Sequence, residues 1–510
     1  MISQLKKKLH RKLSGDSRRN AKNGLVSTLG FLVTFAGLVV TTPLLLKLLG
    51  KEAMGVFVLI RTLVGVGGVL SLGMGQATVR FVAKYQALED SSKVEKIART
   101  TLTFYCLIGL GVGTLLFVSS GFLAGTVFRI PDSLVPEAAD AFRVCGLGLL
   151  AALLFSGYTS ILKGLQRFEL SVASEVTTNV LMLGAHIYLL LNGYGLVALT
   201  YATIGAQIVG LVLAALLVSR LPTLNIRPLP LWDGPSFRET LGFGLYSWLG
   251  STMNKLRSEA PPLILGVLLG TGEVAIYNIA SKVLMQVSRL ITSATSYLFP
   301  YLTQLYEKRQ FEELKKHYYQ MSRILVVVSV ALMSVMVFSG EVILEAWLGA
   351  EEVPLIFWIV QIIAFRFVML PLGVMNFSFI AATNKMKALL VTQSVACIVT
   401  VLGTAIGAYF GGLQGAAFGQ LSILLVIVGN RCYIERKLFK VTSLIYQLGL
   451  VLAATLPLLS LRYFALSMDS GWGEVAIWTS IAIFGAVVIS FGISAVFNKL
   501  KQNLPLAVSE

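Results

Sequence analysis

Polar residues recur every three or four positions along an otherwise apolar segment in the middle of the chain. They are Asn278, Lys282, Gln286, Arg289, Ser293 and Ser296. Because an α-helix turns by about 100° per residue, they share one face, within roughly 80° of arc. A cation in hydrocarbon costs about 2.5 to 3.5 kcal/mol on insertion scales. This face, the polar stripe, therefore predicts a water-filled or anionic environment beside a membrane-length helix.

Other cations lie inside apolar segments, and we expect Arg61, Lys255, Arg257 and Arg366 to join the stripe as contacts to an anionic ligand. If Lys255 pairs with Glu259, four residues later, these apolar segments still carry an excess of about four positive charges. Arg366 is not included in that count. The sequence leaves alternatives open. Arg61 reaches the outer interface if its side chain snorkels, and Lys255 and Arg366 are equally compatible with structural ion pairs.

The clearest acids within apolar segments are Glu175 and Glu259. Each is a candidate proton or sodium site, because the neighbours of a buried carboxylate set its titration, and each is equally a candidate structural counter-ion. We expect Arg143 to pair with Asp140 near the start of a helix, and His186 to be a packing residue.

Catalytic motifs are missing from the sequence. It contains no HExxH, Walker A or GxSxG motif and no cluster with metal-ligand spacing, so we predict no catalytic residue, no metal site and no cofactor. The four cysteines lie far apart in or beside apolar segments and are expected to be packing residues.

The composition identifies the class of protein. Of 510 residues, 56% are hydrophobic and only 13% are charged, and the mean hydropathy is +0.79. Soluble proteins have about twice that charged fraction. Apolar stretches long enough to cross a bilayer about 30 Å thick recur along the chain, which predicts an all-α polytopic membrane protein with about 14 transmembrane helices. We place them at about 24–49, 54–80, 100–128, 138–163, 172–192, 195–219, 239–268, 273–303, 322–348, 353–381, 388–410, 412–434, 443–466 and 474–497.

The basic residues are distributed unevenly between the two sides of these spans. The N-terminal arm, every second loop and the C-terminus hold 31 of the 42 Lys and Arg residues. Positive residues favour the cytoplasmic side, so both termini are predicted to be cytoplasmic. The net charge of +17 then reflects topology and contact with anionic lipids, rather than binding to nucleic acid.

Two segments are repeated, which indicates duplicated lobes. LLGKEAMGVFVLI around Gly50 resembles LLGTGEVAIYNIA around Gly270, and GLVALTYATIGAQ from Gly195 resembles GLQGAAFGQLSIL from Gly412. The predicted organisation is a cytoplasmic basic arm (1–23), an N-lobe of six helices (24–220), a proline-containing cytoplasmic linker (221–237), a C-lobe of six helices (238–440), two extra helices (441–498) and a cytoplasmic tail (499–510).

These motifs, in this order, resemble the polysaccharide (O-antigen type) flippases of the multidrug/oligosaccharidyl-lipid/polysaccharide exporter superfamily. The resemblance rests on LLGKEAMG at the end of the first span, on LSLGMGQATVRFVAKY at the end of the second, and on repetition of this unit six spans later. It implies two six-helix lobes around a central cavity that opens alternately to either side, with two extra C-terminal helices.

The function expected from residues and resemblance is outward movement of polyprenyl-pyrophosphate-linked oligosaccharide across a bacterial cytoplasmic (inner) membrane, for surface polysaccharide biosynthesis. Expected partners are this lipid, anionic membrane lipids and polysaccharide-assembly proteins, and coupling to a proton or sodium gradient is left open. The alternatives are a lipid II flippase and a multidrug exporter of the same superfamily. A membrane glycan polymerase or ligase is the alternative outside transport, although the short outward loops disfavour it.

Overall fold

A computed structural model describes residues 35–37, 39–66, 68–221, 232–295, 298–349, 351–383 and 386–438. Every regular element within these residues is helical, which confirms the predicted all-α class. Five of the described helical segments are long and apolar enough to cross a membrane, or six when the bent pair in one helix is counted as a span. The total of fourteen stays a prediction, and the arm at 1–23, the two helices at 441–498 and the tail at 499–510 lie outside the described residues.

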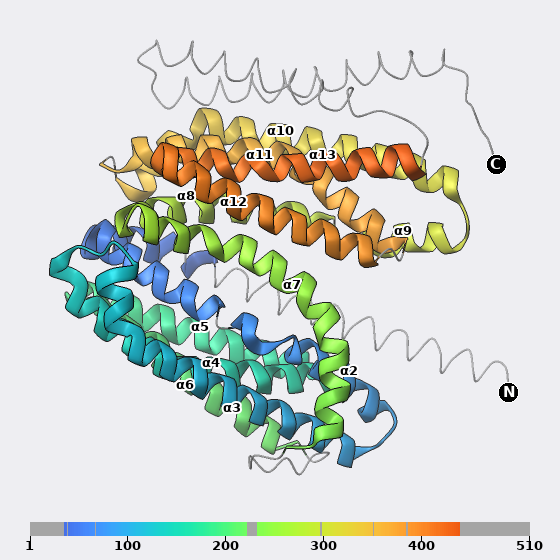
Figure 1. Ribbon diagram of the computed structural model, residues 1–510, viewed down its shortest axis with the longest axis horizontal. Coiled ribbons are helices and arrows are strands. Elements are labelled where there is room, and N and C mark those ends of the chain that lie inside the picture. The colour runs from blue at the N-terminus through green and yellow to red at the C-terminus, as the bar shows by residue number, and fades with distance from the viewer. Residues whose placement is uncertain are drawn as a thin grey trace. The chain divides into compact units, whose positions relative to one another are not determined.

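The helices follow one another with short connections (Figure 1). After a helical stretch over 39–66, they are η1 (Gly68–Ser71), α2 (Met74–Ala87), α3 (Ser91–Phe122), η2 (Leu123–Val127), η3 (Asp132–Leu134), α4 (Val135–Gly164), α5 (Phe168–Leu191), α6 (Leu196–Ser219), α7 (Gly234–Leu268), α8 (Thr271–Ala294), α9 (Leu298–Glu307), α10 (Phe311–Leu348), α11 (Val353–Ala382), α12 (Met386–Gly419), η4 (Gln420–Ser422), α13 (Ile423–Tyr433) and η5 (Ile434–Leu438).

The chain forms two compact units. The first contains the described residues up to Lys255 together with Gly270–Gly272, and the second contains Leu256–Leu269 and the described residues from Glu273 onward. The division falls inside α7, after its predicted start. The linker at 221–237 and the lobe boundaries stay predictions, since residues 222–231 lie outside the described part.

Small residues allow the helices of the first unit to approach closely. A Cβ atom on Gly113 of α3 would overlap the backbone carbonyl of Gly146 of α4, and one on Gly148 would overlap Ile204 of α6. Lipid tails are as apolar as leucine, so membrane helices associate largely through close packing of this kind. Helix α4 accordingly packs against both α3 and α6 (Figure 1).

The repeated segments adopt related backbone conformations. Gly50 and Gly270, which occupy the same place in the two copies of the LLG motif, have φ angles of 81° and 124°. Only glycine adopts such angles readily, so both copies place glycine where the backbone leaves helical geometry. The repeat inferred from the sequence therefore has a structural counterpart.

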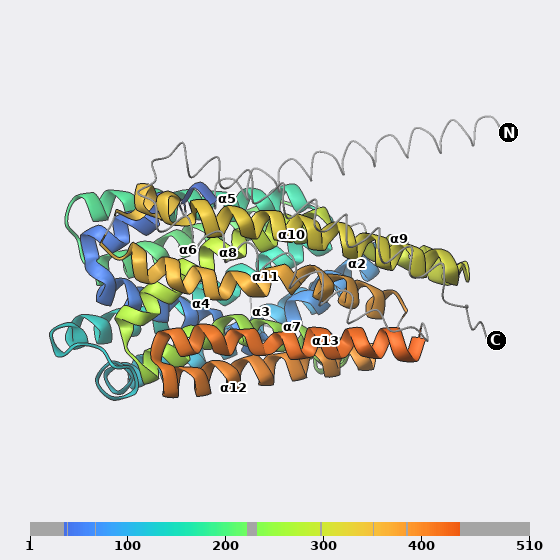
Figure 2. The ribbon, with the colours of Figure 1, turned by 90° about the horizontal axis from the view of Figure 1, so that it is seen from above.

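In the second unit, α12 contains a hairpin turn. Its backbone leaves helical geometry at Gly411 and Gly412, and the glycines on either side face one another across the turn. Cβ atoms on Gly403 and Gly407 would overlap backbone atoms of Gly419 and Gly415. The chain therefore folds back at Gly411–Gly412, between the predicted spans at 388–410 and 412–434, and α13 continues beside α12 (Figure 2).

Candidate functional site

The polar stripe lies on α8, and its described side chains are at least partly exposed. Asn278, Lys282 and Gln286 are partly exposed and Arg289 is exposed, whereas Leu284 is 2% exposed. Ser296 and the side chain of Ser293 lie outside the described part of the structure. The apolar side of the helix is buried only in part, because Met285 is 46% exposed.

Two amide oxygens on the stripe are left without partners. Oδ1 of Asn278 and Oε1 of Gln286 are inaccessible to solvent and accept no hydrogen bond from the described residues. Eight residues separate them, which is about 12 Å along a helix, with Lys282 halfway between. Buried polar atoms nearly always have a hydrogen-bond partner, so these oxygens indicate a place for donors that the described residues do not supply.

Arg366 lies on α11 and donates from Nη1 to Oε1 of Gln420 at 2.8 Å. Gln420 belongs to η4 and is 2% exposed. The structural partner that the sequence left open for Arg366 is thus a neutral amide, so its positive charge is retained.

The other predicted cations fall on two helical segments. Arg61 is exposed on the stretch 39–66, with Cζ 6.0 Å from the centre of the Phe57 ring. Lys255 and Arg257 are both partly exposed on α7, but they belong to different units. Arg257 lies close enough to Arg366 for their charges to repel each other.

The two predicted ion-coupling acids differ in their surroundings. Glu175 on α5 forms an ion pair with Nζ of Lys163 at 2.9 Å and accepts a hydrogen bond from Ser171 at 3.2 Å. The side chains of the pair are 36% and 38% exposed, as expected near a helix end. Glu259 on α7 is partly exposed. A coupling role for either residue stays a prediction.

The structure tests two predictions about residues outside the stripe, the Arg143–Asp140 pair and the packing role of His186. Arg143 pairs with Asp140 at 2.6 Å, which confirms the expected pair. His186 is 4% exposed, as expected for a packing residue, but it has more polar neighbours than the sequence indicated. Its Nε2 lies 2.9 Å from the hydroxyl of Thr203 and 3.2 Å from the carbonyl of Leu199, so it links α5 to α6.

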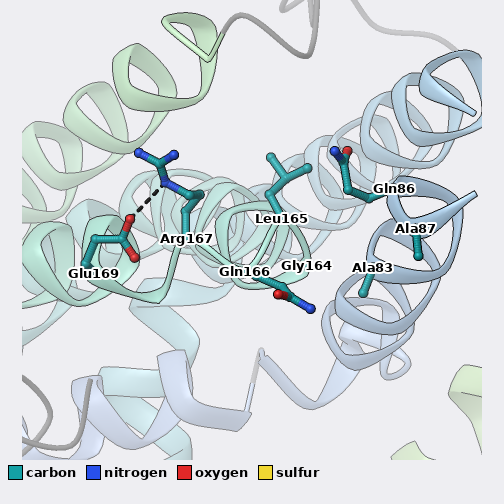
Figure 3. A pocket seen from close by; sticks show the side chains of 8 residues that line it. All are labelled: Ala83, Gln86, Ala87, Gly164, Leu165, Gln166, Arg167 and Glu169. Atoms are coloured by element: carbon teal, nitrogen blue, oxygen red, sulfur yellow. Dashed lines mark ion pairs between the residues drawn. The ribbon is translucent and has the colours of Figure 1, made fainter. Parts of the chain in front are cut away.

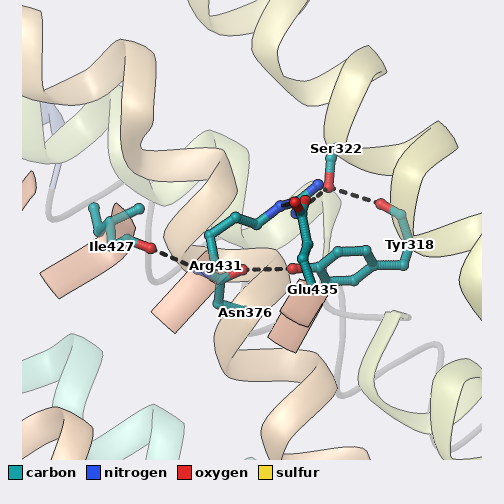
Figure 4. A network of polar contacts seen from close by, with 6 residues as sticks. All are labelled: Tyr318, Ser322, Asn376, Ile427, Arg431 and Glu435. Atoms are coloured by element: carbon teal, nitrogen blue, oxygen red, sulfur yellow. Dashed lines mark hydrogen bonds and ion pairs between the residues drawn. The ribbon is translucent and has the colours of Figure 1, made fainter. Parts of the chain in front are cut away.

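Sequence reasoning missed a buried ionic network in the second unit (Figure 4). Arg431 and Glu435 are both 0% exposed and are joined at 2.7 Å. The Arg431 guanidinium donates to Ser322 at 3.0 Å and lies 4.1 Å from the Tyr318 ring centre. Tyr318 donates to Asn376 at 2.7 Å, and Asn376 donates to the Ile427 carbonyl at 3.0 Å.

Arg431 lies inside the predicted span at 412–434, but its burial and its pairing with Glu435 were not predicted. The available signal was the spacing of four between Arg431 and Glu435, which puts opposite charges on one helix face.

A pocket of about 620 Å³ lies in the first unit, between the end of α2 and the turn from α4 to α5 (Figure 3). Its lining includes Gln86, Gln166, Arg167 and Glu169, and the last two form an ion pair at 2.8 Å. None of the predicted site residues lines it, and its one lining cation is already paired with a carboxylate.

The chain is similar to known transporters over most of its length. A Shigella flexneri protein named as an O-antigen transporter is 20% identical over 373 residues, which are 72% of this chain and 85% of that protein. The structure of the lipid II flippase MurJ matches 94% of this chain and 100% of its own, with 12% identity and a TM-score of 0.71.

An inward-facing MATE family multidrug transporter of the MOP superfamily matches 78% of this chain and 94% of its own, with 16% identity and a TM-score of 0.68. These two structures establish a shared transporter fold. A model of the family described as polysaccharide biosynthesis proteins matches residues 44–354. That match exceeds half of the sequence, so the chain belongs to the polysaccharide biosynthesis protein family and has the fold of MOP superfamily transporters.

Proposed function

We propose that this protein is a flippase that moves polyprenyl-diphosphate-linked oligosaccharide outward across the bacterial inner membrane for surface polysaccharide biosynthesis. The observation that carries the proposal is the stripe on α8. It combines the cations Lys282 and Arg289 with the unpartnered amide oxygens of Asn278 and Gln286. Family membership and the relative named as an O-antigen transporter support the same class of cargo.

The headgroup of such a lipid matches these side chains. A diphosphate diester carries about two negative charges, to which arginine offers a planar pair of donors and lysine a point charge. In a conformation that exposes the amide oxygens of Asn278 and Gln286, sugar hydroxyls supply the donors that these oxygens lack. Several moderate contacts spread along about 16 Å of helix, from Asn278 to Arg289, hold the headgroup without preventing its release.

The cationic character of the stripe distinguishes this proposal from its alternatives. Exporters of cationic drugs need acidic groups facing the cargo, whereas the described part of the stripe carries two cations and no acid. A lipid II flippase remains the second candidate, because lipid II also carries a polyprenyl diphosphate. Expression in cells depleted of their lipid II flippase separates the two: restored growth would favour lipid II as cargo.

Arg289 provides the direct test. We expect Arg289→Ala to abolish display of surface polysaccharide in a deletion strain, and Arg289→Lys to restore part of it, since lysine keeps the charge but loses the planar donor pair. The measurement is the amount of polysaccharide on intact cells, normalised to membrane-inserted protein. Arg143→Ala is the matched control, because Arg143 is already paired with Asp140. Normal display with Arg289→Ala would contradict the proposal.

For energy coupling we propose Glu259, which is partly exposed on α7, as the residue that binds the proton or sodium ion. We expect Glu259→Gln to remain inserted while its transport loses dependence on the ion gradient. The measurement is lipid transport into proteoliposomes with and without an imposed proton or sodium gradient. Retained gradient dependence, or loss of the protein from the membrane, would reject the coupling role.

A further inference from the structure

Two interruptions of helical structure meet at Arg366. The halves of α11, Val353–Arg366 and Met369–Ala382, are bent by 40°. Pro371 accounts for the bend, because it has no N–H for the carbonyl four residues earlier and its ring crowds that carbonyl. Gln420, which accepts the hydrogen bond from Arg366, begins the short 3-10 turn between α12 and α13. Broken membrane helices often present polar groups to a ligand in this way.

A chain of hydrogen bonds fixes the orientation of the Gln420 amide. Its Nε2 donates to the hydroxyl of Thr404 at 2.7 Å, and Thr404 donates its own proton to the carbonyl of Thr400 at 2.7 Å. The Thr404 oxygen is therefore an acceptor only, so the amide nitrogen of Gln420 must face it. The amide oxygen therefore faces Arg366 and accepts the hydrogen bond from its Nη1.

The glycines of the α12 hairpin set the position of this chain. The backbones of Gly403 and Gly419 are so close that neither residue has room for a Cβ atom. Thr404 and Gln420 are the next residues in each arm, and both are buried, with 0% and 2% of their surfaces exposed. Close packing of the hairpin thus brings the two side chains within hydrogen-bond distance.

The surroundings of Arg366 leave its charge uncompensated. Within the described residues, its interactions are the bond to Gln420 and an electrostatic interaction with the hydroxyl of Tyr277, and none involves a carboxylate. Arg257 is close enough to repel it. Two neighbouring guanidinium groups of like charge are stabilised together by a dianion.

The matching repeat in the first unit, from Gly195, has a similar hydrogen bond across a helical hairpin. An offset of 217 residues relates Gly195 to Gly412 and therefore Thr203 to Gln420. Thr203 bonds to His186 across the α5–α6 hairpin at 2.9 Å, and His186 interacts electrostatically with Arg61. In each unit, a polar bond across a helical hairpin thus lies beside an arginine.

We propose that Gln420 is a positioning residue which, anchored by Thr404, holds Arg366 in place to bind the diphosphate of the lipid-linked cargo. This inference rests on the proposed function. It assigns Gln420 and Thr404 roles that act through Arg366 rather than through direct contact with the cargo.

The test uses the full-length protein in nanodiscs, titrated with undecaprenyl diphosphate and, separately, with uncharged undecaprenol, with occupancy measured by native mass spectrometry. We expect wild type to prefer the diphosphate, Gln420→Met to weaken its binding about tenfold, and Thr404→Val to weaken it about threefold. Thr400→Val is the matched control and should bind as wild type. The Thr400 hydroxyl donates only to the Ala396 carbonyl, and valine keeps the backbone carbonyl that Thr404 uses.

A double variant separates positioning from general damage to the fold. In an Arg366→Met background, Gln420→Met should cause no further loss, because its effect passes through Arg366. Wild-type affinity for Gln420→Met, or an additional loss in that background, would overturn the inference while leaving the proposed function intact. If Gln420→Met does not fold, the inference is tested by comparing diphosphate binding of Thr404→Val with that of Thr400→Val. Failure of wild type to prefer the diphosphate would overturn the proposed function itself.

Discussion

Asp233 shows how one side chain sets the start of a long helix. Its carboxylate accepts a hydrogen bond from the backbone N–H of Ser236 at 3.0 Å, and its own N–H donates to Thr100 of α3 at 3.2 Å. The nearby Ser236 hydroxyl and the hydrogen bond from the Ser236 backbone N–H lower the pKa of Asp233 below its usual value, and the charges of Lys96 and Lys93 act in the same direction. The negative charge also interacts favourably with the N-terminus of α7.

This arrangement predicts a specific pH dependence. Because the pKa of Asp233 is lower in the folded protein than in the unfolded one, the carboxylate stabilises the fold above the unfolded pKa, and this contribution is lost as the pH falls through the folded pKa. We expect Asp233→Asn to lower stability by about 0.5 kcal/mol at pH 7. Thermal unfolding in detergent from pH 7 down to pH 3 should show the difference shrinking toward zero, whereas a constant difference would exclude this role.

At the scale of elements, the network around Arg431 connects three helices of the second unit. It joins α10 through Tyr318 and Ser322, α11 through Asn376, and the end of α13 and η5 through Arg431 and Glu435. A fully buried ion pair adds little net stability, because desolvation offsets the attraction between its charges, but a single charge left behind is severely destabilising. The pair therefore makes the relative position of these helices specific.

We expect Arg431→Met to destabilise the protein by about 3 to 5 kcal/mol, because it leaves Glu435 buried without its cation. Adding Glu435→Gln removes the uncompensated charge and should recover most of that loss. Thermal unfolding of purified single and double variants measures the coupling. A double variant whose loss equals the sum of the two single losses would show that the charges do not depend on each other.

Features that depend on local spacing were predictable from the sequence. The helical class, the stripe on α8, the Arg143–Asp140 pair and the repeated LLG turn all follow from residues near one another in the chain. The bond from Arg366 to Gln420 joins residues 54 positions apart, and no periodicity specifies it. Lipid and protein interior are both apolar, so hydropathy does not distinguish a lipid-facing helix face from a packed one. The burial of Arg431 was missed for that reason.

At the scale of the whole molecule, the distribution of Lys and Arg predicts the orientation in the membrane. The turn before α3 belongs to the basic set of loops, and the loop after η2 belongs to the opposite set. Ser92, at the start of α3, and Ser133, in η3, are exposed beyond opposite ends of the apolar part of α3. A serine-to-cysteine substitution can therefore be made on each predicted side of the membrane.

In a variant without its native cysteines, we expect Ser133→Cys to react with a membrane-impermeant thiol reagent added to spheroplasts. Ser92→Cys should react only after lysis, because the positive-inside rule places it in the cytoplasm. The measurement is the labelled fraction of each variant before and after lysis. The opposite pattern would invert the topology, and with it the predicted cytoplasmic location of both termini.

The hairpin of α12 also has a consequence for biosynthesis. A lone glutamine side chain entering the bilayer exposes an amide that hydrocarbon cannot solvate. Here the partner of Gln420 is Thr404, sixteen residues earlier, across the turn at Gly411–Gly412. The two arms can therefore leave the translocation machinery as a paired unit with the amide nitrogen already bonded, and Arg366 of α11, which is synthesised earlier, supplies the donor to the amide oxygen.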